Sequence, residues 1–417
     1  MTFHHHTLGN GLQIVGETSP KALSAAIGFF VRTGARDEEP AVAGVSHFLE
    51  HMVFKGTERR TYLDVNKDFD RIGAQYNAYT SEENTVFYAT VLPEYLPDAI
   101  DILADILRPS LRNDDFDKEK NVIIEEINMY LDQPMSSAYE QGRRIHFNDH
   151  PLGNSVLGTA QSVGGLSREQ MHDYFARRYV AANVTVAVAG NVDWPKLVGM
   201  VEDHCGRWNS GPVERHHVRE AAGSQQFQLV TKESVTQEHV LLFSNGPPAH
   251  SPLRYAAQVL SVVLGDDSGS RLYWALVDPG LVESADTGFS EYEGAGCFIT
   301  SFICEPEGTA KNLEIIRELL RDVQKNGITE EELQVAKSKV TSREVRHNER
   351  PRGRMFAVGM NWTYLKQYRT VDDELQAFDA VTLAQVREVL DRYPLDQTTT
   401  LALGPLPKLA GVERNGK

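Results

Sequence analysis

The chain has 417 residues, of which 41% are hydrophobic and 24% charged, a balance typical of a globular protein long enough for two to four domains. It carries 42 Lys and Arg against 58 Asp and Glu, a net charge of −16. A surface this negative repels phosphate backbones and anionic lipid, so we expect neither a nucleic-acid partner nor a membrane partner. It weakly favours basic peptides as ligands.

The sequence shows no recognisable leader or membrane anchor. Its first residues lack a basic segment followed by an apolar one, and its longest apolar runs fall short of the ~18 residues needed to span a bilayer. Three cysteines in a chain of this length do not indicate a disulfide framework. We therefore expect a cytoplasmic protein.

The first half of the sequence predicts strands that alternate with helices. It opens with a strand at 8–15, a turn at 17–21 and an apolar strand at 23–31. Further strands are predicted at 75–80, 84–92 and 183–189, and helices at 41–54, 62–72, 98–107, 114–131 and 167–179. This order is typical of an α+β fold, in which helices pack on one side of a mainly antiparallel sheet.

Residues 209–226 have no periodicity and contain Gly, Pro, Ser and charged residues, which predicts a linker. The order of elements then restarts, with strands at 226–231, 239–243 and 296–304 and helices at 253–264, 312–325 and 329–348. The helices at 114 and 329 begin about 215 residues apart, which indicates a duplicated unit. We expect two homologous halves, at 1–208 and 227–417.

The segment from 45 to 54 carries the strongest chemical signal. His47 and His51 are four residues apart, so on a helix both side chains lie on one face, with Cβ atoms about 5–6 Å apart. This spacing lets both imidazoles bind one zinc ion. Glu50 lies on the same face, where a general base can take a proton from a water on the metal. The alternative is a pair of histidines on an ordinary helix.

A third ligand is expected from the helix at 114–131. Glu126 lies on its mostly apolar face, whereas Glu125 belongs to the solvated stripe. A carboxylate on an apolar face is costly unless it is paired, hydrogen-bonded or bound to metal. Glu119, seven residues earlier, lies nearly above Glu126 and can support it or replace it. An ion pair between Glu126 and an Arg or Lys of a neighbouring helix is the alternative.

Together these motifs resemble the pitrilysin/insulysin family of zinc metallopeptidases, in particular the two-domain branch that includes mitochondrial processing peptidase and its bacterial relatives. The H-x-x-E-H order is that of the inverted zincins. The likeness covers nearly the whole chain and rests on Thr7-Leu-Gly-Asn-Gly-Leu12, Gly34-Ala-Arg-Asp-Glu38, the segment from Gly44 to Thr57, Asn77-Ala-Tyr-Thr-Ser-Glu82, Val122-Ile-Ile-Glu-Glu-Ile127 and Ser268-Gly-Ser-Arg-Leu-Tyr273.

The resemblance implies one Zn²⁺ per chain, held by the metal ligands His47, His51 and Glu126. It implies Glu50 as the general base and Glu119 as a supporting catalytic carboxylate.

The resemblance also implies that a peptide substrate binds as an added strand at Asn77, Ala78 and Tyr79. The alternatives are that Asn77 is a turn residue and that Tyr79 is a packed aromatic side chain.

The chain departs from the family in its second half. Active members carry an Arg and a Tyr there, and Val277 and Glu283 fall at those positions.

The sequence therefore predicts a zinc endopeptidase subunit that needs a homologous partner subunit, which would supply the missing Arg and Tyr. A heterodimer is favoured over a homodimer for this reason. The first alternative is a non-catalytic structural core-type subunit of a larger complex. A metal-dependent hydrolase of non-peptide substrates is a second alternative with little support.

Overall fold

A computed structural model describes residues 1–211, 215 and 223–409. It divides into two compact units that do not coincide with the two halves of the sequence. The first unit comprises the described residues within Met1–Asn128, Asn154–His216 and Val345–Thr370. The second comprises those within Met129–Gly153, His217–Glu344 and Val371–Lys417. Most of the expected linker at 209–226 lies outside the described residues.

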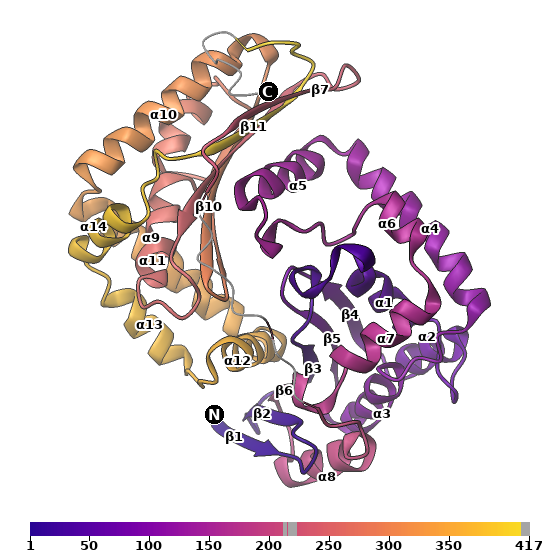
Figure 1. Cartoon of the computed structure of the whole chain (residues 1–417). Helices are drawn as coiled ribbons and strands as arrows, with labels where there is room; N and C mark the ends of the chain where they lie inside the picture. The colour runs from indigo at the N-terminus through magenta and orange to yellow at the C-terminus, as the bar shows by residue number, and fades with distance from the viewer. Residues whose placement is uncertain (212–214, 216–222, 410–417) are drawn as a thin grey trace. The chain divides into compact units, whose positions relative to one another are not determined.

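The first unit is built on a six-stranded sheet (Figure 1) with the strand order β1-β2-β6-β3-β5-β4. Neighbouring strands are antiparallel except β2 and β6, which run parallel. The strands are β1 (Thr2–Thr7), β2 (Gln13–Thr18), β3 (Ala25–Val31), β4 (Gln75–Thr80), β5 (Thr85–Val91) and β6 (Val184–Gly190). β4 therefore forms one edge of this sheet.

The predicted strand at 8–15 is wrong, because a tight turn interrupts it. The Gly11 amide donates to the Leu8 carbonyl at 2.9 Å, and Gly11 has a φ of 92°, which glycine adopts without strain. The turn joins β1 to β2 as a hairpin, so the three histidines of the N-terminal segment lie in a strand.

Most helices of the first unit cover one face of its sheet. They are α1 (Val45–Val53), α2 (Tyr62–Arg71), α3 (Leu96–Ile106), α4 (Asn113–Asp132), α6 (Ala160–Gly165), α7 (Arg168–Arg178) and α8 (Trp194–Cys205). Their apolar faces form one core with the sheet, in which Phe29, Phe48 and Ile100 are fully buried. Burial of these apolar faces is the main force that holds the helices on the sheet.

The second unit repeats this plan with five strands in the order β7-β11-β8-β10-β9. β7 and β11 are parallel and the other neighbours antiparallel, which matches the order and directions of β2-β6-β3-β5-β4. The strands are β7 (Phe227–Thr231), β8 (Glu238–Gly246), β9 (Ser284–Tyr292), β10 (Ala295–Cys304) and β11 (Thr399–Gly404). The helices are α9 (Arg254–Leu264), α10 (Thr309–Asn326), α11 (Glu330–Asn348), α13 (Val371–Asp379) and α14 (Leu383–Arg392). The expected mixed fold of two similar halves is confirmed.

Each unit also receives one helix from the other half of the sequence. α12 (Pro351–Leu365) packs on the first unit's sheet, where Met355 and Val358 contact the cluster that contains Phe30. α5 (Pro134–Phe147) packs on the second unit's sheet, where Ala138 contacts the cluster that contains Phe243. Each of these helices covers the sheet face opposite the main helical layer, an arrangement that the sequence did not predict.

All three cysteines are buried as free thiols, in agreement with the absence of a disulfide framework. Among the helices in the described part of the chain, none combines the length and the apolar character needed to cross a bilayer.

Candidate metal centre

Helix α1 begins at a position that only glycine fits. Gly44, its N-cap, has a φ of 92°, and a Cβ at this position would lie 2.6 Å from the Leu157 carbonyl oxygen. The buried Glu38 carboxylate accepts hydrogen bonds from the amides of Gly44 at 2.6 Å and Ser46 at 2.7 Å. These bonds satisfy two amides that a helix start leaves unpaired, so they fix where α1 begins.

Glu38 is held in an environment that disfavours its charge. Burial raises the pKa of the Glu38 carboxyl to about 8, although the hydrogen bonds from Ser46 and Gly44 act in the opposite direction. Desolvation of a carboxylate in the protein interior is therefore the larger effect at this residue.

The two faces of α1 have different roles. One face is apolar and buried in the core of the first unit; it comprises Val45, Phe48, Leu49, Met52 and Val53. The other face carries His47, Glu50 and His51. The helical period places these three together, as the sequence predicted.

Helix α4 lies beside α1 and presents two carboxylates to it. Phe116 of α4 stacks on Phe48 of α1, with ring centroids 4.7 Å apart. Glu119 and Glu126, two turns apart on α4, both face the histidines. Val122, which the sequence placed on the same apolar stripe, is 47% exposed, so this face of α4 is only partly buried.

His47, His51 and Glu126 bring one ligand atom each to a common point. Their ligand atoms lie within 4.8 Å of one another, and within the described ranges no other group of three such residues does so. Oε2 of Glu126 is 3.5 Å from Nε2 of His51 and 3.8 Å from Nε2 of His47. Glu126 makes no ion pair with an Arg or Lys in the described part of the chain, so the alternative of such a partner has no support there.

These separations suit a tetrahedral zinc ion. With metal–ligand distances of about 2.0–2.2 Å, two ligands of a tetrahedron are about 3.3–3.6 Å apart. The distances from Glu126 to both histidines are within a few tenths of an ångström of that range. The donor set of two imidazoles and one carboxylate is one that zinc prefers, and it leaves a fourth position open.

Glu119 orients His51 from behind. Its Oε1 atom lies 2.8 Å from Nδ1 of His51, and its Oε2 atom is 2.5 Å from Nζ of Lys55. Burial raises the pKa of Glu119, but its hydrogen bonds with His51 and Lys55 outweigh burial and hold the pKa below its usual value. Glu119 is therefore a carboxylate that accepts the Nδ1 proton of His51 and leaves Nε2 free for a metal.

The two histidines differ in their affinity for protons. Burial, reinforced by His51, lowers the pKa of His47 to about 3, so His47 is neutral and ready to bind a metal. Burial also opposes the charged form of His51, but the hydrogen bond to Glu119 and the charge of Glu126 outweigh it and raise the pKa of His51. The carboxylates around His51 therefore favour a positive charge at this point, which a metal ion would supply.

Glu50 is held by a residue that the sequence analysis did not single out. The Thr80 hydroxyl, at the end of β4, donates to Oε2 of Glu50 at 2.6 Å. Burial raises the pKa of Glu50 against the lowering effect of this hydrogen bond. Neither the Thr80–Glu50 contact nor the Lys55–Glu119 contact carries a sequence signal of its own, because each joins elements that only the fold brings together.

The predicted substrate residues lie on the edge strand β4 but differ in their surroundings. Asn77 is exposed, and its Oδ1 accepts the amide of Ala78 at 2.9 Å. Ala78 is buried on the face toward α1. Tyr79 packs on the opposite face, against Phe356 of α12, as the packed-aromatic alternative describes. The backbone edge of this strand and the exposed side chain of Asn77 are what remains available.

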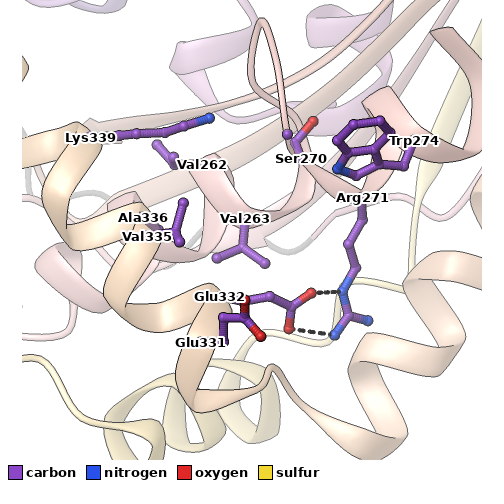
Figure 2. Close-up of a pocket in the computed structure, with 11 residues that line it drawn as sticks. Val262, Val263, Ser270, Arg271, Trp274, Glu331, Glu332, Val335, Ala336 and Lys339 are labelled. Atoms are coloured by element: carbon purple, nitrogen blue, oxygen red, sulfur yellow. Dashed lines mark hydrogen bonds and ion pairs between the residues drawn. The ribbon is translucent and has the colours of Figure 1, made fainter. Parts of the chain in front are cut away.

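The second unit does not offer an oxyanion donor at the two positions that depart from the family pattern. Val277 packs against the apolar core of that unit. Glu283 accepts a hydrogen bond from the Gln237 amide at 2.8 Å. Nearby, Arg271 is held by Glu332 at 2.7 Å (Figure 2), so this cation serves an ion pair.

Comparison with known proteins places the chain in a family. Residues 13–160 match the insulinase family (peptidase family M16), and residues 165–340 match the peptidase M16 inactive domain. The chain belongs to the peptidase M16 family. It is 34% identical over 405 residues to an uncharacterized zinc protease of Mycobacterium leprae. The aligned region covers 96% of this chain and 91% of that protein. It is 33% identical over 391 residues to the uncharacterized zinc protease YmxG of Bacillus subtilis, with 91% and 93% covered.

Solved structures share this fold. A protease from Helicobacter pylori superposes with a TM-score of 0.90 at 22% identity, over 97% of this chain and 99% of that one. A chain of complex III from Candida albicans superposes with a TM-score of 0.85 at 17% identity, over 99% and 98%. The fold is thus shared by a protease and by a chain of complex III.

Proposed function

We propose that this M16 protein is a zinc-dependent endopeptidase subunit that hydrolyses peptides or unfolded segments. The observation that carries the proposal is the convergence of His47, His51 and Glu126, with Glu50 on the same face of α1. A bound Zn²⁺ would lower the pKa of a water molecule to about 7 and polarise the scissile carbonyl.

The side chains of the site divide the work of the reaction. Nε2 of His47, Nε2 of His51 and Oε2 of Glu126 would hold the metal. Glu119 fixes the tautomer of His51, and Lys55 holds Glu119 in place. Glu50 accepts the proton of the attacking water and returns it to the leaving amine, as general acid–base catalysis requires.

The edge of β4 is the proposed docking site for the peptide. β4 is the last strand of its sheet, so its outer backbone groups pair with no strand in the described part of the chain. An extended peptide can add to this edge by main-chain hydrogen bonds, which tolerate many side chains. Asn77, Ala78 and Tyr79 would contribute their backbone, and Asn77 also its exposed side chain.

The positions of Val277 and Glu283 support a requirement for a homologous partner subunit. Neither side chain can donate to a developing oxyanion, and loss of one such donor costs about 10²–10³ in rate. A second M16 chain that carries Arg and Tyr at these positions would supply the missing donors, so we favour a heterodimer.

The alternative is a structural subunit, for which the likeness in fold to a complex III chain is the supporting observation. A scaffold has no need for two histidines and a carboxylate arranged at metal-binding separations. We therefore favour the peptidase.

The decisive experiment measures bound zinc and peptide hydrolysis on the chain alone and mixed with an M16 chain that carries the Arg/Tyr pair. We expect one zinc per chain and activity that appears with the partner and disappears in Glu50→Gln, which keeps the ligands and removes the base. Full activity of the chain alone would overturn the partner requirement. Absence of both zinc and activity would favour the structural role.

Zinc binding itself can be tested with a matched pair of variants on α4. Glu126→Gln should lower zinc affinity strongly, because it removes a ligand. Glu125→Gln alters the neighbouring exposed carboxylate and should leave zinc affinity unchanged. Equal zinc affinity in the two variants would contradict the assignment of Glu126 as a ligand.

A further inference from the structure

We propose that Thr80 is a positioning residue that fixes the orientation of the general base Glu50 relative to the bound peptide. The inference rests on the proposed peptidase function and adds to it a residue outside the metal-binding and base groups. It is carried by one short hydrogen bond between the edge strand β4 and the helix α1.

The alternation of side chains along β4 places the Thr80 side chain on the face toward α1. Successive side chains of a strand alternate between its two faces, so Thr80 shares the face of Ala78, which is buried toward α1. Tyr79, between them, packs on the opposite face against α12. Thr80 pairs in register with Thr85 of β5, next to a tight turn in which the Ser81 amide donates to the Asn84 carbonyl at 2.8 Å. Its position is therefore set by the sheet.

The direction of the hydrogen bond follows from the neighbouring hydroxyl. Thr85 donates its proton to the Thr33 carbonyl at 2.9 Å, so Thr85 is an acceptor toward Thr80. The Thr80 oxygen is 3.5 Å from the Thr85 oxygen but only 2.6 Å from Oε2 of Glu50. A hydroxyl has one proton, and a carboxylate is a pure acceptor, so the Thr80 proton goes to Glu50.

This hydrogen bond gives the two carboxylate oxygens of Glu50 different roles. Oε2 is occupied by the Thr80 hydroxyl, which leaves Oε1 to accept the proton of the attacking water. The Thr80 backbone also acts on the Glu50 carboxylate, so without the hydroxyl the carboxylate would be held less firmly and would spend less time in the reactive geometry.

The bond also ties the base to the peptide. Thr80 directly follows the segment 77–79 on whose edge the substrate is proposed to pair, so peptide backbone, Thr80 and Glu50 are held in one frame. Orientation of this kind affects the chemical step more than binding, so its loss should lower kcat and leave KM unchanged.

Three substitutions test this role. Thr80→Val keeps the shape of the side chain and removes the hydroxyl, Thr80→Ser restores the hydroxyl, and Thr90→Val is the matched control. The Thr90 hydroxyl is buried on β5 without a hydrogen-bond partner in the described part of the chain, so the same change there removes no contact. Activity is measured on the zinc-loaded protein with the partner subunit, and zinc content is measured for each variant.

We expect Thr80→Val to lower kcat by about 10–100-fold, as substitution of supporting residues typically does, with KM and zinc content unchanged. Thr80→Ser should recover most of the activity, and Thr90→Val should behave as wild type. A Thr80→Val variant with wild-type kcat would overturn the proposal. Loss of zinc or of folding in Thr80→Val that Thr80→Ser does not restore would also overturn it, by showing a structural role.

A second measurement does not depend on activity. In crystals of the zinc-free Thr80→Val protein, we expect the Glu50 carboxylate to leave its wild-type position, and in Thr80→Ser to keep it. An unmoved Glu50 in Thr80→Val would contradict the proposal. If the wild-type protein binds zinc but cleaves no peptide, the proposed function fails, whereas the position of Glu50 still decides the role of Thr80.

Discussion

Helices α1 and α9 occupy equivalent places in the two units, yet of these two helices only α1 carries candidate metal ligands. Each follows the third strand of the shared five-strand order, β3 or β8, and each packs an apolar face on its sheet. α1 presents His47, Glu50 and His51 on its other face, whereas α9 contains no His, Asp, Glu or Cys. The same architecture thus carries a group of candidate metal ligands in one unit and no such group in the described part of the other, so activity must be argued from side chains rather than from the fold.

Helices α5 and α12 are exchanged between the two halves of the sequence, since each packs in the unit formed mainly by the other half. In contrast to α1 and α9, these two exchanged helices have the same packing features. α5 and α12 each begin with Pro, and each has Gly eight residues later, Gly142 and Gly359. A Cβ on Gly142 would overlap the Phe243 ring, and one on Gly359 would overlap the Phe30 ring. The packing of this helix on its sheet is therefore common to both units, whereas the candidate metal ligands belong, within the described ranges, to the first unit alone.

The largest expected effect follows from removing one exchanged helix. A fragment of residues 1–208 lacks α12, so the sheet face that contains Phe30, Val86 and Tyr88 would be exposed to water. We expect this fragment to aggregate or to bind a hydrophobic dye strongly, and a peptide of residues 345–370 to restore a compact fold. A monomeric fragment with a cooperative unfolding transition in the absence of the peptide would contradict the assignment of α12 to the first unit.

A smaller effect is expected from the buried ion pair that anchors α12. Arg354 pairs with Glu17 of β2, and both side chains are buried. Arg354→Met should lower the free energy of unfolding by about 3–5 kcal/mol, because Glu17 remains as a buried charge. Urea denaturation measures this value.

The control for that ion pair is Arg392→Met, which breaks the exposed pair with Glu388 and should cost less than about 1 kcal/mol. If the two substitutions have equal effects, α12 is not anchored by Arg354.

The two equivalent contacts of the exchanged helices can be compared directly. Gly142→Ala and Gly359→Ala should each destabilise the protein by about 1–3 kcal/mol through overpacking against a phenylalanine ring. An exposed helical Gly→Ala change would instead stabilise by about 1 kcal/mol, so the sign of the effect is informative. Gly199→Ala on α8, where a Cβ would meet no atom within 4 Å, is the control.

The last effect concerns pH and the start of α1. Burial raises the pKa of Glu38 in the folded state to about 8, so the folded protein holds this proton more tightly than the unfolded chain, in which the carboxyl has its ordinary pKa of 4.5. The contribution of Glu38 to stability is therefore full below about pH 4.5 and is lost as the pH rises through about 8. Urea denaturation at pH 6 and pH 8 should show a decline in wild type that is reduced in Glu38→Gln. Equal declines in both proteins would show that Glu38 does not titrate in this range.

Much of the candidate metal site was accessible from the sequence because its parts are local. The spacing of His47 and His51 needs only one helix, and the face of Glu126 follows from the helical period of a second. β4 was predicted at its observed bounds, 75–80, because it alternates and is followed by a turn.

The sequence could not supply contacts that depend on distant segments. Thr80 reaches Glu50 only because β4 lies beside α1, and neither residue type signals the other. The exchange of α5 and α12 was missed for the same reason, since no local pattern says which sheet a helix will cover. The opening strand was misplaced because its apolar residues continue through a turn that Gly11 permits.

The place of α5 in the second unit also has a consequence for how the chain is made. Its sheet partners β8 and β11 are synthesised roughly 90 and 250 residues after α5, so at about 5–20 residues per second the complete surface is delayed by about 10–50 s. During that time the apolar side of α5 has left the ribosome without the complete surface that covers it. Production of this protein should therefore depend on factors that shield nascent chains, and slow translation of the C-terminal strand should increase aggregation.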